Sequence, residues 1–191
     1  MNHISHFYFA KHPLTSPEYI IGLILPDFIR KTSAHTRFLK GMTEHDALDK
    51  HFHNWDWFEQ QTLKLTRTGT QFPTKYTLSH IALEIAIDHF LAHRMQTPFE
   101  QIYDSLNDTH EQRHLDKQTA SHLNQITQSN YYHQYRVLPS CQQILQRTYH
   151  RFQKRWDLES VNTDNLFSQS LQIVEPEIEN IISYCERFRV M

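Results

Sequence analysis

The sequence predicts an all-α protein, and three observations lead to that expectation. Apolar residues recur with a period of about 3.6 through most of the chain, as on the buried face of a helix. Only 3 of the 191 residues are Gly and 7 are Pro, so few positions favour tight turns. Strand-like alternation is confined to the short stretch FYF near the start. No repeat, linker or low-complexity segment divides the chain, so we expect a single helical bundle domain over residues 1–191.

The first expected helix covers SPEYIIGLILPDFIR. Ser16 is a favourable N-cap, and Pro17 would occupy the first helical position, where its missing N–H has no partner to lose. Pro26 should kink or end this helix just before Asp27, because proline removes a backbone hydrogen bond and clashes with the preceding turn.

A second helix is expected to begin at Thr43, where TEHD resembles a capping box, and to run through ALDKHFHNWDWFEQQTLKL to a stop near Gly69. A third is expected from Thr77 to Arg94, and TPFEQIYDSLND begins a fourth at Pro98. Further helices are expected over residues 110–127, 139–156 and 163–189.

Composition and charge argue against several functional classes. The net charge is -2 and the pI is about 6.7, so no global charge attracts nucleic acid or an anionic membrane. The apolar run YIIGLIL is too short to span a bilayer. Cys141 and Cys185 match no zinc spacing and suggest a reducing compartment. The start has no signal-peptide pattern, and we expect a soluble cytoplasmic protein.

Histidine is in excess, with 15 residues, which raises the expectation of a metal or acid–base site. In the third expected helix His89 lies at the centre of an apolar stripe, and Asp88 lies at its edge. A metal ion would compensate the burial of both groups. For this pair alone, the more common arrangement is a solvated Asp88 and a hydrogen-bonded core His89.

Other candidates come from three further segments. His45 and Asp49 are four residues apart on the second expected helix, so both can reach one divalent ion, although such pairs are also common on solvated faces. His53 continues their line. Asp27 follows the proline break and can point inward or into water. His6 lies in the apolar segment ISHFYF, where a hydrogen-bonded core histidine is the simpler interpretation.

Together these candidates form a set of nitrogen and oxygen donors without a thiol. Such a set suits Mn, Fe or Mg better than a structural zinc. A metal bound there would lower the pKa of water and provide hydroxide at neutral pH, which is the chemistry of phosphoester hydrolysis. The chain has no Gly-rich phosphate loop, no G-x-S-x-G elbow and no H-E-x-x-H motif.

Four short motifs, in this order, resemble those of the acyl carrier protein phosphodiesterase family, a divergent branch of the HD-type metal phosphohydrolases. They are an MNxxxHxxxA-like start, GLILPDFIR, HDALD and DHFLAHR, with a weaker likeness as far as VEPEIENIISY. The resemblance therefore covers nearly the whole chain.

The resemblance implies a helical fold, a divalent metal of the Mn type, and hydrolysis of the phosphodiester that links 4'-phosphopantetheine to a carrier-protein serine. The implied metal ligands at matched positions are His6, Asp27, His45, Asp49, Asp88 and His89. Asp27 and Asp49 are also catalytic candidates, and Arg30 would hold a phosphate oxygen.

The chain departs from the family pattern at three places. Leu23 replaces an Asn, Asp46 stands where Arg is frequent, and Met95 lies where a Trp is often found. These departures leave open a nucleotide or another small phosphoester as substrate, and a helical binding protein without turnover is a further alternative.

A basic stripe is expected on the helix that contains CQQILQRTYHRFQKRW. Its members follow at helical spacing and are Arg147, His150, Arg151, Lys154 and Arg155. The stripe can steer an acidic carrier protein, or it can be a solvated helix face balanced by nearby acids.

Overall fold

The computed structural model describes residues 3–28, 36–67, 74–156 and 161–190, and within these ranges every regular element is a helix. The expected all-α class is confirmed. The elements are α1 His3–Tyr8, α2 Pro17–Ile24, η1 Leu25–Asp27, η2 Thr36–Phe38, α3 Leu39–His53, α4 Asp56–Arg67, α5 Thr74–Arg94, α6 Phe99–Leu106, α7 Thr109–Gln112, α8 Lys117–Gln128, α9 Tyr131–Gln134, α10 Leu138–Trp156, α11 Thr163–Val174, η3 Glu175–Glu177 and α12 Ile178–Val190.

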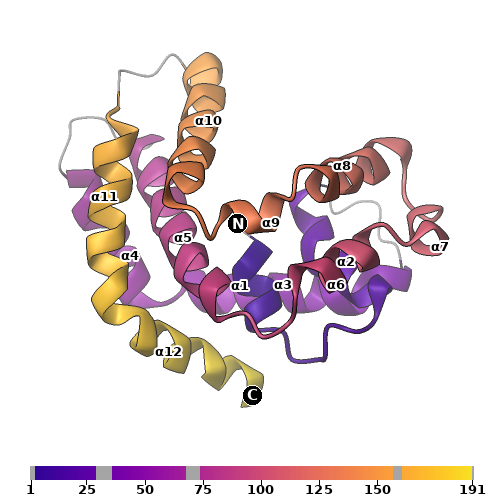
Figure 1. Ribbon diagram of the computed structural model, residues 1–191. Helices are drawn as coiled ribbons and strands as arrows, with labels where there is room; N and C mark the ends of the chain where they lie inside the picture. Colours follow the sequence, from indigo (N-terminus) through magenta and orange to yellow (C-terminus); the bar gives the residue numbers. More distant parts are fainter. Residues whose placement is uncertain (1–2, 29–35, 68–73, 157–160, 191) are drawn as a thin grey trace.

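Helix α5 is the centre of the structure, with α1, α4, α10 and α11 packed around it (Figure 1). Its residues Ala82, Leu83, Ile85 and Ala86 are fully buried. Polar residues on a helix with neighbours on several sides cannot all reach water, so Asp88 is also completely buried. Among the described residues, no helix is both long enough and apolar enough to cross a membrane.

The helices α2 and α3 cross at two glycines. A Cβ atom added to Gly22 would lie 2.5 Å from the carbonyl oxygen of Phe38. One added to Gly41 would clash with the carbonyl oxygen of Tyr19 and lie 2.7 Å from the backbone nitrogen of Leu23. Glycine is therefore required at both positions, because the two backbones approach too closely for a side chain.

Several expected boundaries are confirmed. The Ser16 side chain accepts a hydrogen bond from the backbone N–H of Tyr19, Pro17 begins α2, and the chain tightens into the 3₁₀ turn η1 at Pro26. Helix α5 ends at Arg94, and α6 follows Pro98 directly.

The expected start of the second helix at Thr43 is wrong, because α3 already begins at Leu39. Packing of Gly41 against α2 and burial of Phe38 outweigh the local capping signal. This helix also does not continue into α4. The chain leaves the helix at Asn54, and the next residue, Trp55, stacks on Tyr184 with ring centroids 4.2 Å apart.

Three other expectations needed correction. The FYF stretch near the start is not strand-like, because its first two residues belong to α1. The expected helix over residues 110–127 is divided into α7 and α8, and Asp116 caps α8 by accepting the N–H of Thr119. The expected helix over residues 163–189 is interrupted by η3. Helix α9 was not expected.

Replacement of Gly41 by Ala should lower the free energy of unfolding by about 1–3 kcal/mol, since the added methyl group overpacks a backbone crossing. Chemical denaturation would measure this change. Thr43→Ala is a matched control, because Thr43 is exposed on the same helix and should change stability by less than about 0.5 kcal/mol. Equal stability of the two variants would contradict the close crossing.

Candidate metal centre

Three short segments bring four of the expected ligands together. His6 comes from α1, Asp27 from η1, and His45 and Asp49 from α3. The Nε2 atom of His6 lies 3.3 Å from Oδ1 of Asp49, and Nε2 of His45 lies 3.4 Å from Oδ2 of the same carboxylate. Asp27 approaches His45 with an oxygen 3.9 Å from Nε2. We call these four residues the first group.

Hydrogen bonding leaves part of the first group unsatisfied. Both ring nitrogens of His6 and the Oδ1 atom of Asp49 are buried, and none of them makes a well-aligned hydrogen bond. The rings of His6 and His45 stack in parallel with their centroids 3.9 Å apart, so both Nε2 atoms approach the same carboxylate. Buried polar atoms without partners are rare, and a bound cation is one explanation for them.

His45 is held in the orientation that is typical of a metal ligand. Its Nδ1 atom lies 2.7 Å from the carbonyl oxygen of Leu23, which can only accept a hydrogen bond. Nδ1 therefore carries the proton, and in the neutral ring Nε2 presents its lone pair to Asp27 and Asp49. Ligating histidines commonly fix their second nitrogen in this way.

Electrostatics in the first group favour anionic carboxylates and a neutral His6. Burial lowers the pKa of His6 to about 4 against the opposing effect of Asp49. Burial also lowers the pKa of His45, but Asp49 and Asp27 outweigh it and raise that pKa. For both aspartates burial opposes ionisation, yet the contacts with His3, His6 and His45 hold their pKa values well below the usual range.

His3 belongs beside this group although the sequence did not single it out. Its Nε2 atom lies 3.2 Å from Oδ2 of Asp27, and its Nδ1 atom lies 3.1 Å from the hydroxyl of Tyr132. His3 and His6 are three residues apart, so they share a face of α1. This three-residue spacing could have identified His3 from the sequence. It did not, because no helix was expected before Ser16.

Asp88 and His89 are not brought into the first group. The carboxylate of Asp88 accepts the backbone N–H groups of Ile4 and Ser5, at 3.2 and 3.0 Å, and the Ser5 hydroxyl. It thereby holds the start of α1, and the alternative of a solvated Asp88 is wrong. The Nδ1 atom of His89 lies 2.6 Å from the carbonyl oxygen of Tyr135, as in the core-histidine alternative. Arg30 lies outside the described residues.

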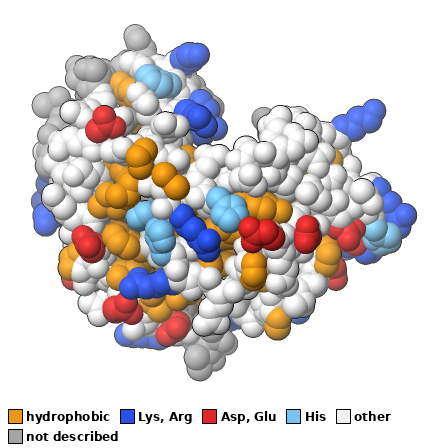
Figure 2. Space-filling model, viewed as in Figure 1, with side chains coloured by type: hydrophobic (Ala, Val, Ile, Leu, Met, Phe, Trp, Pro, Cys, Tyr) orange, Lys and Arg blue, Asp and Glu red, His pale blue; other side chains and the backbone are white. Residues whose placement is uncertain are grey.

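A cavity of about 1050 Å³ opens beside the first group. His3 and Asp27 line one part of it, and Arg147, Arg151 and Lys154 of α10 line another. Figure 2 shows the molecule hollowed between α10 and α8. Four members of the basic stripe, these three and His150, therefore border the cavity that Asp27 lines, whereas the side chain of Arg155 lies outside those that the structure describes.

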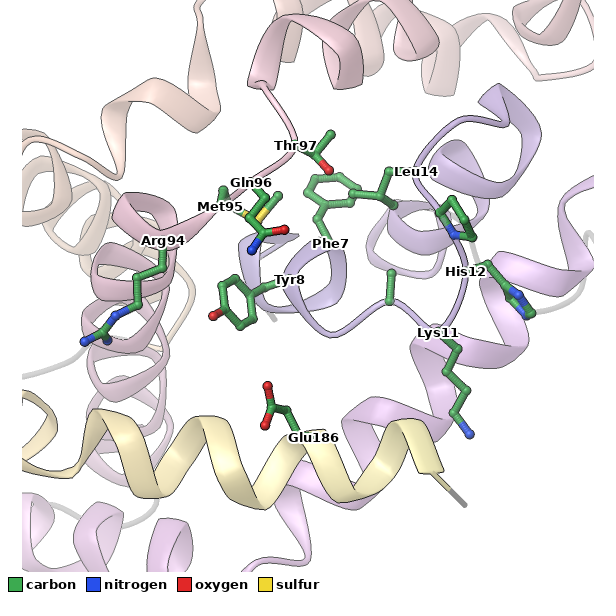
Figure 3. Close-up of a pocket in the computed structure, with 12 residues that line it drawn as sticks. Phe7, Tyr8, Lys11, His12, Leu14, Arg94, Met95, Gln96, Thr97 and Glu186 are labelled. Carbon is green, nitrogen blue, oxygen red and sulfur yellow. The ribbon is translucent and has the colours of Figure 1, made fainter.

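A second cavity of about 430 Å³ lies between the loop after α1, the loop after α5, and α12. Figure 3 shows Glu186 of α12 pointing into the space next to Tyr8. No residue of the first group lines it.

Comparison with models of known protein families matches residues 1–181 to the family described as acyl carrier protein phosphodiesterase. No curated protein and no solved structure gives a match. The likeness to the HD phosphohydrolase fold therefore stays a prediction.

Replacing Asp88 by Asn should destabilise the protein and weaken metal binding together. The amide cannot accept at both positions, so an N–H group of α1 loses its partner at a cost of about 1–3 kcal/mol. Because α1 carries His6, Mn²⁺ should bind about 10–100-fold more weakly, as is usual when a ligand's support is lost. Urea denaturation and calorimetric titration measure the two effects, with Asp46→Asn on the exposed side of α3 as control. Weaker binding at unchanged stability would instead favour Asp88 as a direct ligand.

Proposed function

This chain belongs to the acyl carrier protein phosphodiesterase family, and we propose that it acts as a metal-dependent phosphodiesterase on holo-acyl carrier protein. The bond cleaved would be the phosphodiester between 4'-phosphopantetheine and the carrier-protein serine. Water adds to phosphorus and the serine oxygen leaves with a proton, which gives apo carrier protein and phosphopantetheine.

The proposal of a metal requirement rests on the ligand atoms that the first group brings together. His6, His45 and Asp49 offer one atom each within 4.8 Å of one another, and Asp27 adds a second carboxylate. Two imidazoles and two carboxylates suit Mn²⁺, with Fe²⁺ and Mg²⁺ as alternatives. When bound, such an ion polarises a phosphoryl oxygen and lowers the pKa of water.

The protein's own groups would hold and orient the ion. Leu23 fixes the tautomer of His45, and the carboxylates of Asp27 and Asp49 supply negative charge. Of the histidines around the first group, His3 is the one that lines the large cavity. Its Nε2 atom faces Asp27 and its Nδ1 atom faces the Tyr132 hydroxyl, so we assign to His3 the orientation of Asp27, and the leaving serine oxygen would take its proton from water. Arg30 as a phosphate contact stays a prediction.

The cavity also suits the substrate's flexible arm. Its apolar lining includes Phe28, Ile81, Ile85, Ile126 and Ile144. Polar groups at the edges include Gln125 and Thr148. A pantetheine arm alternates methylene groups with amides, so it would match a mainly apolar space with a few hydrogen-bonding groups.

An acidic carrier protein would dock on the α10 side of the cavity. Arg147, Arg151 and Lys154 project from one side of this helix. Acidic groups on the partner would be attracted there, which speeds encounter and orients the partner over the site. Arg155 remains a predicted member of the same surface.

A small phosphoester, such as a nucleotide, is the second candidate substrate. The departure at Leu23 does not disturb the first group, because His45 contacts the backbone carbonyl there rather than the side chain. The departure at Asp46 lies on the exposed side of α3. Neither departure therefore favours the small phosphoester, and the cavity's basic edge would attract either an acidic protein or a phosphate. Absence of both turnover and metal binding would favour a helical binding protein.

Incubation of the protein with holo-acyl carrier protein and Mn²⁺ should remove the phosphopantetheine mass, measured by intact-protein mass spectrometry. His45→Ala should lower the rate by at least about 100-fold, because it removes a ligand, and a chelator should abolish turnover by the wild type. Arg113→Ala, an exposed change distant in sequence from the first group, serves as control. A His45→Ala variant that is as active as the wild type would contradict the assignment.

The double variant Arg151→Glu, Lys154→Glu should lower kcat/KM for holo-acyl carrier protein while leaving hydrolysis of a small phosphodiester nearly unchanged. Charge reversal repels an acidic partner, and the effect should shrink as ionic strength rises. Steady-state kinetics at two salt concentrations measure this difference. Equal losses on both substrates would count against docking on α10.

A further inference from the structure

A second convergence of ligand atoms lies where α3 meets α5. His53 is the last residue of α3, and His80 and Glu84 are four residues apart on α5. The Nε2 atoms of His53 and His80 lie 3.1 and 3.0 Å from the same oxygen of Glu84, Oε1. The two Nε2 atoms are 3.2 Å from each other. We call these three residues the second group, and it shares no residue with the first.

Hydrogen bonds explain this triangle only in part. A proton placed between the two nitrogens cannot also lie between a nitrogen and the carboxylate, and two N–H groups aimed at one oxygen bring like partial charges together. A tetrahedral Zn²⁺ ion has ligands at about 2.0–2.1 Å, which places neighbouring ligand atoms about 3.3 Å apart. All three sides of the triangle are close to that value, as expected for three corners of a tetrahedron.

We propose that His53, His80 and Glu84 bind a divalent transition-metal ion of the Zn²⁺ class, at a site separate from the first group. Two imidazole nitrogens and one carboxylate oxygen form a donor set that Zn²⁺ accepts, with a fourth position left to water.

Burial and exposure around the second group fit this assignment. The side chain of Glu84 is 5% exposed, whereas those of His53 and His80 are 35% and 22% exposed. The carboxylate therefore needs a cationic partner inside the protein, and an ion can enter past the histidines. The ring of His80 packs edge-on against Phe58, with centroids 4.7 Å apart, which restricts its orientation before any ion binds.

The second ion would also support the first group. His53 follows His45 and Asp49 at successive helical turns of α3, and Glu84 precedes Asp88 by one turn on α5. An ion held by His53 and Glu84 would fasten the end of α3 to α5. It would thereby hold α3, which carries His45 and Asp49, against α5, which carries the Asp88 that supports α1. Glu84 also lines the large cavity, so the ion would lie near its wall.

The test is Zn²⁺ binding by the metal-stripped full-length chain, with stoichiometry measured by equilibrium dialysis and elemental analysis. His45→Ala removes a ligand of the first group, so a Zn²⁺ ion that this variant still binds would be bound by the second group. This variant should bind one Zn²⁺. Addition of His80→Gln should weaken that binding by at least about 100-fold, since even loss of an outer partner costs 10–100-fold. His93→Ala, an exposed histidine of the same helix, should have no effect.

Co²⁺ provides a second measurement that does not depend on enzyme activity. In the His45→Ala background, Co²⁺ should give the intense visible absorption of a tetrahedral ion, and His80→Gln should abolish it. His53→Ala at the more exposed end of α3 repeats the test, and circular dichroism verifies that each variant is folded. Absence of Zn²⁺ in the His45→Ala variant, or equal Zn²⁺ binding with and without His80, would overturn the proposal and leave an ion-paired Glu84. Neither result bears on turnover by the first group.

Discussion

The structure depends on one buried carboxylate at the middle of its central helix. Asp88 accepts the first N–H groups of α1, which have no partner within that helix. A helix of 6 residues is not stable on its own, so α1 needs such an anchor. Burial raises the pKa of Asp88 to about 7, although hydrogen bonds from Ser5 oppose this shift. Burying the ionised carboxylate therefore costs free energy. The position of His3 and His6 depends on it.

A second constraint acts from the opposite side of the first group. The glycine crossing brings α2 close enough to α3 for the carbonyl oxygen of Leu23 to reach His45. A side chain at Gly41 would separate the helices and release that contact. The Asp88 anchor and the glycine crossing contain no residue of the first group. Together they nevertheless determine how the histidines of that group are oriented.

The same two helices organise the surroundings of the site. Helix α3 presents His45, Asp49 and His53 in successive turns, and α5 supplies Glu84 to the second group. Both groups border the cavity between α8 and α10, the first through Asp27 and the second through Glu84. The carboxylates of Asp27 and Glu84 line one part of that cavity, and basic side chains of α10 line another. Because the carboxylates repel an anion, only a cation bound by the first group would make that side of the cavity attractive to a phosphate.

The sequence by itself determined the helical class, the cap at Ser16, the break at Pro26, and the pairing of His45 with Asp49, because these features depend on neighbours within one or two turns. It also identified the family through four short motifs. The start of α3 at Leu39, the inclusion of His3 and the anchoring role of Asp88 were decided only by the tertiary structure. They depend on contacts between segments far apart in the chain, such as Ser5 with Asp88, and no local periodicity carries that information.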